Sequence, residues 1–272
     1  GPSTGLPTKT EQSDLLQAVY GRNGDSPVIV IAASTPSNCF YYSFMAAKLA
    51  IEHMTPVILL TDGYIANGAE PWKIMSTDEL PDIKPPHATP ETEGWLAYKR
   101  DDETLARQWA IPGMKGLEHR VGGLEKEKDT GNVNYQPMNH EYMVKIRQEK
   151  VNRVANYIPD LEVEGVEEGE LLVVGWGGTY GALHSAVAHL HNEGHSIALA
   201  HFNFINPLPK NTAELFARYK RIIICELNTG QMVVHLRAKF PQFEYMKYNK
   251  IQGLPFTIME LSQKFQQLLK NN

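Results

Sequence analysis

The sequence is poor in cysteine, with only Cys39 and Cys225 among its 272 residues. Neither belongs to a CxxC pair, so this chain alone lacks the thiolate set of a structural zinc site or an iron–sulfur cluster. Two isolated thiols are typical of a reducing compartment and not of a disulfide scaffold. We therefore expect a cytoplasmic protein that holds no metal ion of its own.

Long apolar runs and an excess of basic residues are also missing. No run approaches the roughly 18 residues that suggest a membrane-spanning helix. The chain has 26 Lys and Arg against 31 Asp and Glu, a formal net charge of −5. This balance argues against nucleic acid as the main partner, because such proteins carry basic surfaces. With 42% hydrophobic residues, the composition is that of a globular chain with one or two cores.

The N-terminal part, residues 1–75, has the pattern of an α/β unit. Apolar spacing and β-branched runs predict a helix that opens after Thr8 and ends at about Tyr20, then a strand, a helix and a strand at 27–33, 37–54 and 56–60. Thr8 and Glu11 have the spacing of a capping box for the first helix. The strand–helix–strand order predicts parallel, buried strands with a right-handed crossover. Two strands are too few to close a sheet, so we expect the C-terminal part of a domain that starts upstream of Gly1.

The middle part, residues 76–166, lacks such periodicity over most of its length. It begins with four prolines between residues 81 and 90. Eight acidic and three basic residues between positions 78 and 105 give this stretch the net charge of the whole chain. We interpret it as a solvated, Pro/Gly-rich acidic connector followed by a polar helix over about 139–157.

The C-terminal part, residues 167–272, is regular again. Buried-strand patterns alternate with helical spacing, with strands at 171–174, 197–203, 221–225 and 244–248 and helices at 180–192, 213–219, 232–239 and 256–269. Four strand–helix repeats in about 100 residues predict a complete doubly wound domain with a parallel sheet.

The opening residues Gly1 to Gly5 formally match the G-x-S-x-G nucleophile elbow of serine hydrolases. However, no strand precedes them, and Pro7 follows closely. A loop in which the hydroxyls of Ser3 and Thr4 bind an anion fits the residues better. A plain turn remains the alternative.

Three further patterns are weak signals of function. Gly175, Gly177 and Gly181 are one residue off the dinucleotide fingerprint, and no acid ends the following strand to bind a ribose. Four histidines between residues 184 and 195 lack a completing carboxylate or thiolate, which favours an exposed polar face over a metal site. Asp62, at the end of a predicted strand, either contacts a ligand or caps the next turn.

Several further segments form recognisable motifs along nearly the whole chain. They are Gly1-Pro-Ser-Thr-Gly-Leu-Pro-Thr8, Glu11-Gln12, Asp14-Leu15, Pro56-Val-Ile-Leu-Leu-Thr-Asp62, Gly116-Leu-Glu-His119, Gly131-Asn132, Glu226-Leu-Asn228, Gly230-Gln231 and Gly253-x-Pro-Phe256. Taken together, these segments resemble the α subunit of thiamine-diphosphate-dependent 2-oxoacid:ferredoxin oxidoreductases, most closely the 2-oxoglutarate type. The resemblance is most specific in the opening octapeptide.

The resemblance implies an α/β fold, with part of a transketolase-like pyrimidine-binding domain followed by a transketolase C-terminal-like domain. It implies that Ser3, Thr4 and Gly5 approach the carboxylate of the 2-oxoacid substrate. It also implies that the Glu226-to-Gln231 motif orders a strand-to-helix turn or an interface. No catalytic residue is assigned to this chain, and its cofactor-binding residues stay unassigned.

Family members carry an upstream segment with a Tyr-Pro-Ile-Thr-Pro-type motif, a Glu for the aminopyrimidine and an Arg before the Gly-Pro-Ser-Thr loop. None of these is present, so we expect an N-terminally truncated fragment that is inactive and binds no cofactor alone. The resemblance implies that a partner β subunit brings the iron–sulfur cluster and most of the thiamine diphosphate–magnesium site.

The function implied is oxidative decarboxylation of a 2-oxoacid, with coenzyme A taking the acyl group and ferredoxin the electrons, in a homo-oligomer or heteromer. Two alternatives stay open. The chain is a non-catalytic scaffold that holds a multi-subunit complex together, or it is a nucleotide-binding α/β module.

Overall fold

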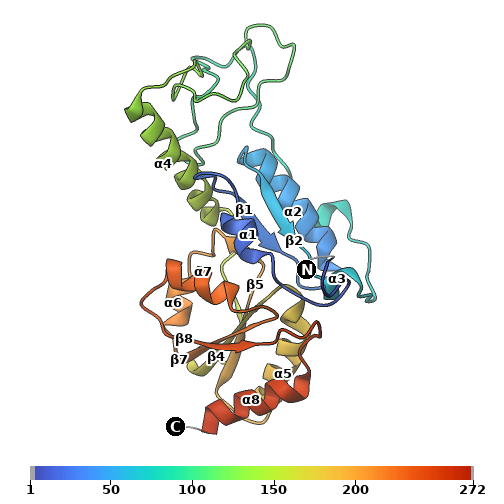
Figure 1. The fold of residues 1–272 in the computed structure, drawn as a ribbon. Helices are drawn as coiled ribbons and strands as arrows, with labels where there is room; N and C mark the ends of the chain where they lie inside the picture. Colours follow the sequence, from blue (N-terminus) through green and yellow to red (C-terminus); the bar gives the residue numbers. More distant parts are fainter. Residues whose placement is uncertain (1–3, 271–272) are drawn as a thin grey trace.

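The computed structural model describes residues 4–270, which form an elongated molecule with two β-sheets (Figure 1). The strands are β1 (Ile29–Ala32), β2 (Val57–Leu60), β3 (Val163–Gly165), β4 (Gly169–Trp176), β5 (Ile197–Phe202), β6 (Phe204–Asn206), β7 (Tyr219–Glu226) and β8 (Tyr245–Asn249). The helices are α1 (Leu15–Tyr20), α2 (Asn38–Glu52), α3 (Gly63–Ala66), α4 (Pro137–Arg153), α5 (Tyr180–Asn192), α6 (Thr212–Phe216), α7 (Gln231–Lys239) and α8 (Ile258–Lys270). A long irregular segment and α4 lie at one end of the molecule, and the larger sheet lies at the other.

The larger sheet confirms the four strand–helix repeats predicted for the C-terminal part. Its order is β3-β5-β4-β7-β8, and all neighbours are parallel except β3, a short antiparallel edge strand that the sequence did not reveal. Helices α5 and α8 cover one face, while α1, α6 and α7 cover the other. Strand β4 lies at the centre with both faces covered, which explains its continuous apolar sequence.

The smaller sheet has the order β2-β1-β6. Strand β1 pairs in parallel with β2 over four residues, which confirms the predicted strand–helix–strand unit. Strand β2 is half-buried and not fully buried as expected, because it lies at the edge of this sheet. The third strand, β6, comes from the C-terminal part and pairs antiparallel with β1. The side-chain amides of Asn203 and Asn206 fix it there by donating to the carbonyls of Ala32 (2.8 Å) and Val28 (2.7 Å).

One apolar cluster joins the two sheets. It contains buried side chains of α1 and β1 together with those of β4, β5, β7 and α7. A second cluster, under α2 and the end of α4, covers the other face of β1. The N-terminal and C-terminal parts therefore share one continuous core, because each leaves an apolar face that only the other buries.

The expected capping box at Thr8 is wrong, and the first helix is shorter than predicted. Helix α1 begins only at Leu15, and Thr8 adopts a positive φ of 60°. The cause is tertiary. The backbone amides of Thr10 and Gln12 donate to carbonyls of the C-terminal part, at 3.3 and 3.2 Å, so this stretch is not free to form helix.

The middle of the chain has little regular structure, as its prolines and glycines predict. Residues 67–136 contain one 3-10 turn, Thr77–Glu79, and three isolated β-bridges. All eight acidic residues between positions 78 and 105 are exposed. Helix α4 then returns the chain towards the smaller sheet. Across residues 4–270, no helix combines the length and apolar character needed to cross a membrane.

This arrangement predicts the behaviour of the chain after limited proteolysis. Proteases should cut first between about residues 76 and 135, because this segment has few backbone hydrogen bonds. The two fragments should stay together, since the β1–β6 pairing and the shared core hold them. We expect an unchanged elution volume in size-exclusion chromatography, with separation of the fragments only in denaturant. Fragments that elute separately without denaturant would contradict this.

Candidate functional site

The loop that the sequence singled out lies on the surface. Of its proposed site residues, Ser3 lies outside the described residues, while Thr4 and Gly5 are both exposed. No residue between 4 and 270 forms a hydrogen bond with the Thr4 side chain. Gly5 has a positive φ of 120°, a backbone conformation that favours glycine, and open space surrounds its α-carbon. The hydroxyl of Thr4 is therefore free to meet a ligand that comes from outside this chain.

The base of the loop rests on a turn of the C-terminal part. Gly253 has a φ of 67°, and a β-carbon there would lie 2.5 Å from Cδ2 of Leu6 and 2.9 Å from Cβ of Lys9. Its carbonyl accepts the amide of Thr10 at 3.3 Å. Any larger residue at this position would push the loop away, so Gly253 sets how closely the loop approaches the turn.

Next along the chain, Gln12 is a buried polar anchor. Its carboxamide oxygen accepts the amide of Leu227 (3.0 Å), and its Nε2 donates to the carbonyl of Trp176 (2.7 Å). Its own amide donates to the Leu227 carbonyl at 3.2 Å. One side chain thus satisfies a backbone group of the last residue of β4 and another just beyond the end of β7.

The turn between β7 and α7 completes this contact. Asn228 Nδ2 donates to the Gln12 carbonyl at 2.8 Å, and its Oδ1 accepts the amides of Gly230 (2.7 Å) and Gln231 (3.0 Å). The side chain of Gln231 then accepts the amide of Leu16 at 2.9 Å. The implied role of this motif, in ordering a turn or an interface, is confirmed in both senses. The sequence did not show that residues 12–16 are its partner.

Glu226 lies buried beneath this turn. Its carboxylate accepts hydrogen bonds from Trp176 Nε1 (3.2 Å), Asn228 Nδ2 (3.0 Å) and the amide of Met232 (2.7 Å). Burial raises the pKa of Glu226, while these hydrogen bonds act in the opposite direction. Its position before the first turn of α7 also favours an acidic group. The residue organises the turn and exposes no oxygen to solvent.

Of the two roles left open for Asp62, the cap is confirmed. Its Oδ1 accepts the amides of Tyr64 (3.0 Å) and Ile65 (3.1 Å) at the start of α3, and its Oδ2 accepts the amide of Gly178 at 2.6 Å. A β-carbon on Gly178 would lie 2.5 Å from this carboxylate. The glycines after β4 thus allow close packing of the two parts. This contact takes the place that a dinucleotide phosphate would occupy in a fingerprint turn.

Of the four histidines of α5 and its end, His184, His189 and His191 are exposed as expected, and His195 is half-buried. His184 pairs with Glu164, while His189 and His195 lie 3.5 and 4.0 Å from Glu193. Within residues 4–270, no group of three or more His, Cys, Asp or Glu side chains has the arrangement of a metal site.

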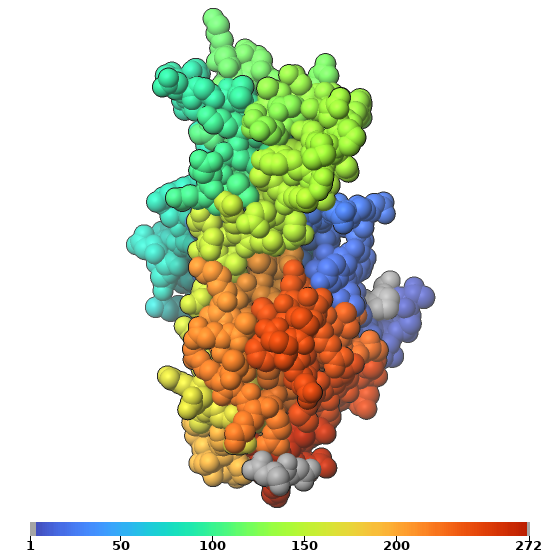
Figure 2. Space-filling view, turned by 90° about the vertical axis from the view of Figure 1, so that its left-hand side faces the viewer, coloured from blue at the N-terminus to red at the C-terminus, as the bar shows by residue number. Residues whose placement is uncertain are grey.

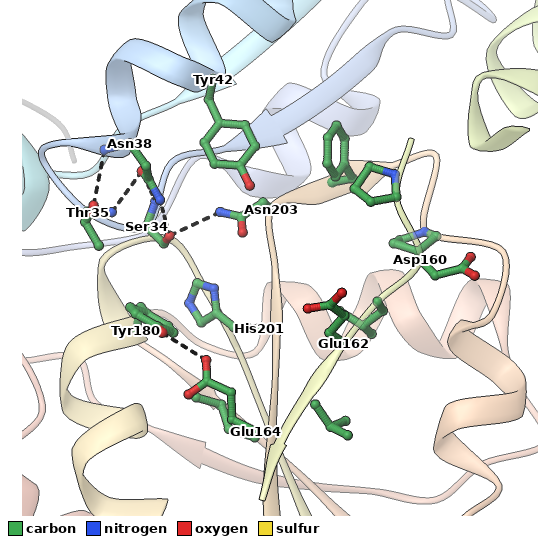
Figure 3. A pocket seen from close by; sticks show the side chains of 16 residues that line it. Ser34, Thr35, Asn38, Tyr42, Asp160, Glu162, Glu164, Tyr180, His201 and Asn203 are labelled. Atoms are coloured by element: carbon green, nitrogen blue, oxygen red, sulfur yellow. Dashed lines mark hydrogen bonds between the residues drawn. The ribbon is translucent and has the colours of Figure 1, made fainter. Parts of the chain in front are cut away.

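A cavity of about 440 Å³ lies between the smaller sheet and β5, near the carboxyl ends of β1 and β5 (Figure 3). Ser34 and Asn203 line its upper side in this view, and Tyr180 and Glu164 line its lower side. Both ring nitrogens of His201 are buried here without a hydrogen-bond partner among the described residues. Burial lowers the pKa of His201 to about 3, so its ring is neutral at physiological pH.

The fold and site define an α/β protein whose exposed hydroxyl-bearing loop is anchored on a parallel C-terminal sheet. Residues 1–139 match the family model described as pyruvate flavodoxin/ferredoxin oxidoreductase, thiamine diphosphate-binding. The chain therefore belongs to this family.

Comparisons with individual proteins agree with this. The chain is 47% identical to the 2-oxoglutarate oxidoreductase subunit KorA of Mycobacterium tuberculosis, over 96% of this chain and 40% of that protein. It is 28% identical to the α subunit of a 2-oxoacid:ferredoxin oxidoreductase of Aeropyrum pernix, over 100% of this chain and 43% of that protein. The chain thus spans less than half the length of these relatives.

Among solved structures, the chain is similar to the 2-oxoglutarate:ferredoxin oxidoreductase of Magnetococcus marinus, described with 2-oxoglutarate, coenzyme A and succinyl-CoA bound. The TM-score is 0.89 at 32% identity, over 99% of this chain and 47% of that one. These findings confirm the resemblance that the sequence motifs indicated, including the α/β fold with a thiamine-diphosphate-binding-type domain.

The buried contact at Gln12 predicts a large effect of Asn228→Ala. The substitution removes the side chain that bridges the turn to residue 12 and leaves buried donors unpaired, which costs about 2–4 kcal/mol of unfolding free energy. Urea unfolding followed by circular dichroism measures the loss. Asn192→Ala, an exposed change at the end of α5, should shift stability by less than about 0.5 kcal/mol. Equal effects of the two substitutions would disprove the anchoring role.

The buried histidines predict a loss of stability in acid. Burial lowers the pKa of His201 to about 3 and that of His235 to about 4. The unfolded chain therefore binds more protons, and stability falls as the pH drops from about 6.5 towards 4, by about 2–3 kcal/mol for each histidine.

Urea unfolding at pH 7 and at pH 4.5 measures this dependence. His201→Gln should flatten it, and the exposed control His191→Gln should not. The same pH dependence in His201→Gln as in the parent chain would show that His201 is not the titrating group.

Proposed function

We propose that this chain is part of the α subunit of a 2-oxoacid:ferredoxin oxidoreductase that uses 2-oxoglutarate. The enzyme would oxidatively decarboxylate the 2-oxoacid, transfer the acyl group to coenzyme A and pass the electrons to ferredoxin. The family match and the identity of 47% to a 2-oxoglutarate oxidoreductase subunit support this assignment. The similarity to a solved enzyme described with 2-oxoglutarate and succinyl-CoA bound supports the choice of substrate.

The single observation that carries the proposal is the exposed loop around Thr4. We propose that Ser3, Thr4 and Gly5 contact the carboxylate of the 2-oxoacid, with the Thr4 hydroxyl as hydrogen-bond donor. This hydroxyl has no partner within residues 4–270, and the anchored turn at Gly253 limits where the loop can move. A hydroxyl donor suits a carboxylate because it binds the anion at a small desolvation cost.

The cofactor that this chemistry needs is thiamine diphosphate, which supplies the nucleophile and the electron sink when it is bound. The loop fits a position beside it, since neutral donors there can orient a bound oxoacid. The Mg²⁺ ion that accompanies a diphosphate prefers oxygen ligands such as carboxylates and amide oxygens. No group of three or more candidate metal ligands occurs among the described residues. As the family resemblance implies, we propose that a partner β subunit holds the magnesium, like the iron–sulfur cluster.

The proposal includes the organisation of the assembly. Its partners are a β subunit and ferredoxin, in a homo-oligomer or heteromer. We propose that residues 1–75 belong to the pyrimidine-binding-type domain, 76–166 form the connector with its helix, and 167–272 form the transketolase C-terminal-like domain. Strand β6 of the third segment pairs with β1 of the first segment, which supports close packing of these two segments. Two free thiols, Cys39 and Cys225, support a cytoplasmic location.

A substitution of Thr4 tests the proposal in the assembled enzyme that contains this chain. Thr4→Val keeps the shape and removes the donor. Loss of one charge-assisted hydrogen bond, worth about 1.5–3 kcal/mol, should lower kcat/KM for 2-oxoglutarate about ten- to a hundredfold. The affinity for thiamine diphosphate should stay nearly unchanged. The measurement is 2-oxoglutarate- and coenzyme A-dependent reduction of ferredoxin.

Thr77→Val is the matched control, because Thr77 is exposed in the middle segment and its hydroxyl has no hydrogen bond among the described residues. It should leave kcat/KM unchanged. Wild-type kcat/KM in Thr4→Val would remove this residue from the site, and the absence of ferredoxin reduction in the parent assembly would overturn the function itself.

A further inference from the structure

A second cavity of about 440 Å³ lies at the end of the molecule opposite α8, where the irregular middle segment packs against α4. In the space-filling view these residues form the green end of the molecule (Figure 2). We call this cavity the cationic pocket. It is lined by Tyr98, Arg100, Arg107, Gly122, Gly123, Leu124, Glu125, Lys126, Met143, Arg147 and Lys150.

The lining of the cationic pocket contains five basic side chains and one acidic side chain. The basic residues come from three stretches far apart in the sequence, namely Arg100, Arg107, Lys126, Arg147 and Lys150. This concentration is unusual in a chain whose net charge is −5. All five are buried or half-buried, so water screens their charges less than at an open surface.

Most of these charges lack a compensating carboxylate. Glu125 accepts from Arg147 at 3.2 Å and is shared with His140 at 2.7 Å. No ion pair is formed by the other four basic residues within the described part of the chain. They donate instead to backbone carbonyls, as Lys150 does to Met54 (2.8 Å) and Arg100 to Lys128 (3.2 Å). A carbonyl satisfies a donor but leaves the net charge in place.

The pKa values of two basic residues in the cationic pocket are lowered. Burial, followed by repulsion from Arg100, Arg107 and Arg147, lowers the pKa of Lys150 to about 8. Burial and repulsion from Arg107 also lower the pKa of Arg100. Clustered, partly buried charges of one sign destabilise a fold unless an opposite charge joins them.

From this geometry we propose that the cationic pocket binds a phosphate group, either inorganic phosphate or the phosphate of a small phosphorylated metabolite. The guanidinium groups of Arg100 and Arg107 present planar donor forks that match a tetrahedral oxyanion. Tyr98 holds one fork in place, because the guanidinium carbon of Arg107 lies 4.1 Å above its ring centroid. The volume of about 440 Å³ lies within the range of small-molecule sites.

Binding is tested with the purified chain by isothermal titration calorimetry at constant ionic strength. Inorganic phosphate and glycerol 3-phosphate are the probes, and sodium chloride replaces them in the reference titration. We expect a dissociation constant below about 1 mM for at least one probe. Tighter binding of glycerol 3-phosphate would identify a metabolite site, and equal or tighter binding of inorganic phosphate a site for the free ion. No binding of either probe above the chloride reference would overturn the proposal.

Arg107→Gln should weaken binding about tenfold or more, because it removes both a charge and a donor fork. Arg107→Lys keeps the charge without the donor fork, so its affinity should lie between those of the parent chain and Arg107→Gln. The test therefore stays decisive if Arg107→Gln does not fold. Arg120→Gln and Lys115→Gln are matched controls, since both residues are exposed on the same segment and outside the pocket. Equal affinity in Arg107→Gln and Arg120→Gln would overturn the proposal.

Proton uptake gives a second readout that a general surface effect would not produce. Sulfate serves as probe, because it does not titrate near pH 8. The charged or titratable groups near Lys150 are Arg100, Arg107, Lys126, Glu125, Arg147 and His53. A bound anion raises the pKa of Lys150, so binding at pH 8 should take up a fraction of a proton, and less at pH 6.5. Titrations in two buffers of different ionisation enthalpy measure it. Uptake that persists in Lys150→Met would contradict the site.

Discussion

The position of the N-terminal loop depends on one buried contact, the carboxamide of Gln12 between the ends of β4 and β7. A buried amide is stable only when its donors and its acceptor are paired. Here the partners are backbone groups of Trp176 and Leu227, which the larger sheet holds rigidly. This requirement fixes residues 10–12 against the C-terminal part and shortens α1. The loop with Thr4 therefore starts from a rigid base.

The same contact between residues 6–16 and the C-terminal part explains why several residues of the motifs that indicated the family lie close together although they are far apart in sequence. Asn228 and Gln231 reach residues 12–16, and Gly253 gives Leu6 the room it needs. They determine how the loop is presented, which is a positioning role. Their types follow from geometry, because the contacts need side-chain amides with both donors and acceptors, and a residue without a β-carbon.

Within the middle segment and α4, charge is divided between the surface and one cavity. The eight acidic residues between positions 78 and 105 are exposed, where water solvates them at little cost. Basic residues of the same segment and of α4 turn inward and line one cavity. The net charge of the chain does not reveal this basic lining, because the exposed acidic residues outnumber the basic residues of the pocket. An acidic chain thus contains a strongly basic pocket.

The sequence by itself determined the parallel α/β architecture, since continuous β-branched runs and helical spacing are local patterns that burial on both faces requires. Its motifs also identified the family and the loop of Thr4. Only the tertiary structure decided the rest. Strands β3 and β6 are three residues long and carry too little periodicity to be recognised. Asp62 became a cap, and the cationic pocket formed, because contacts between distant segments depend on packing and not on spacing along the chain.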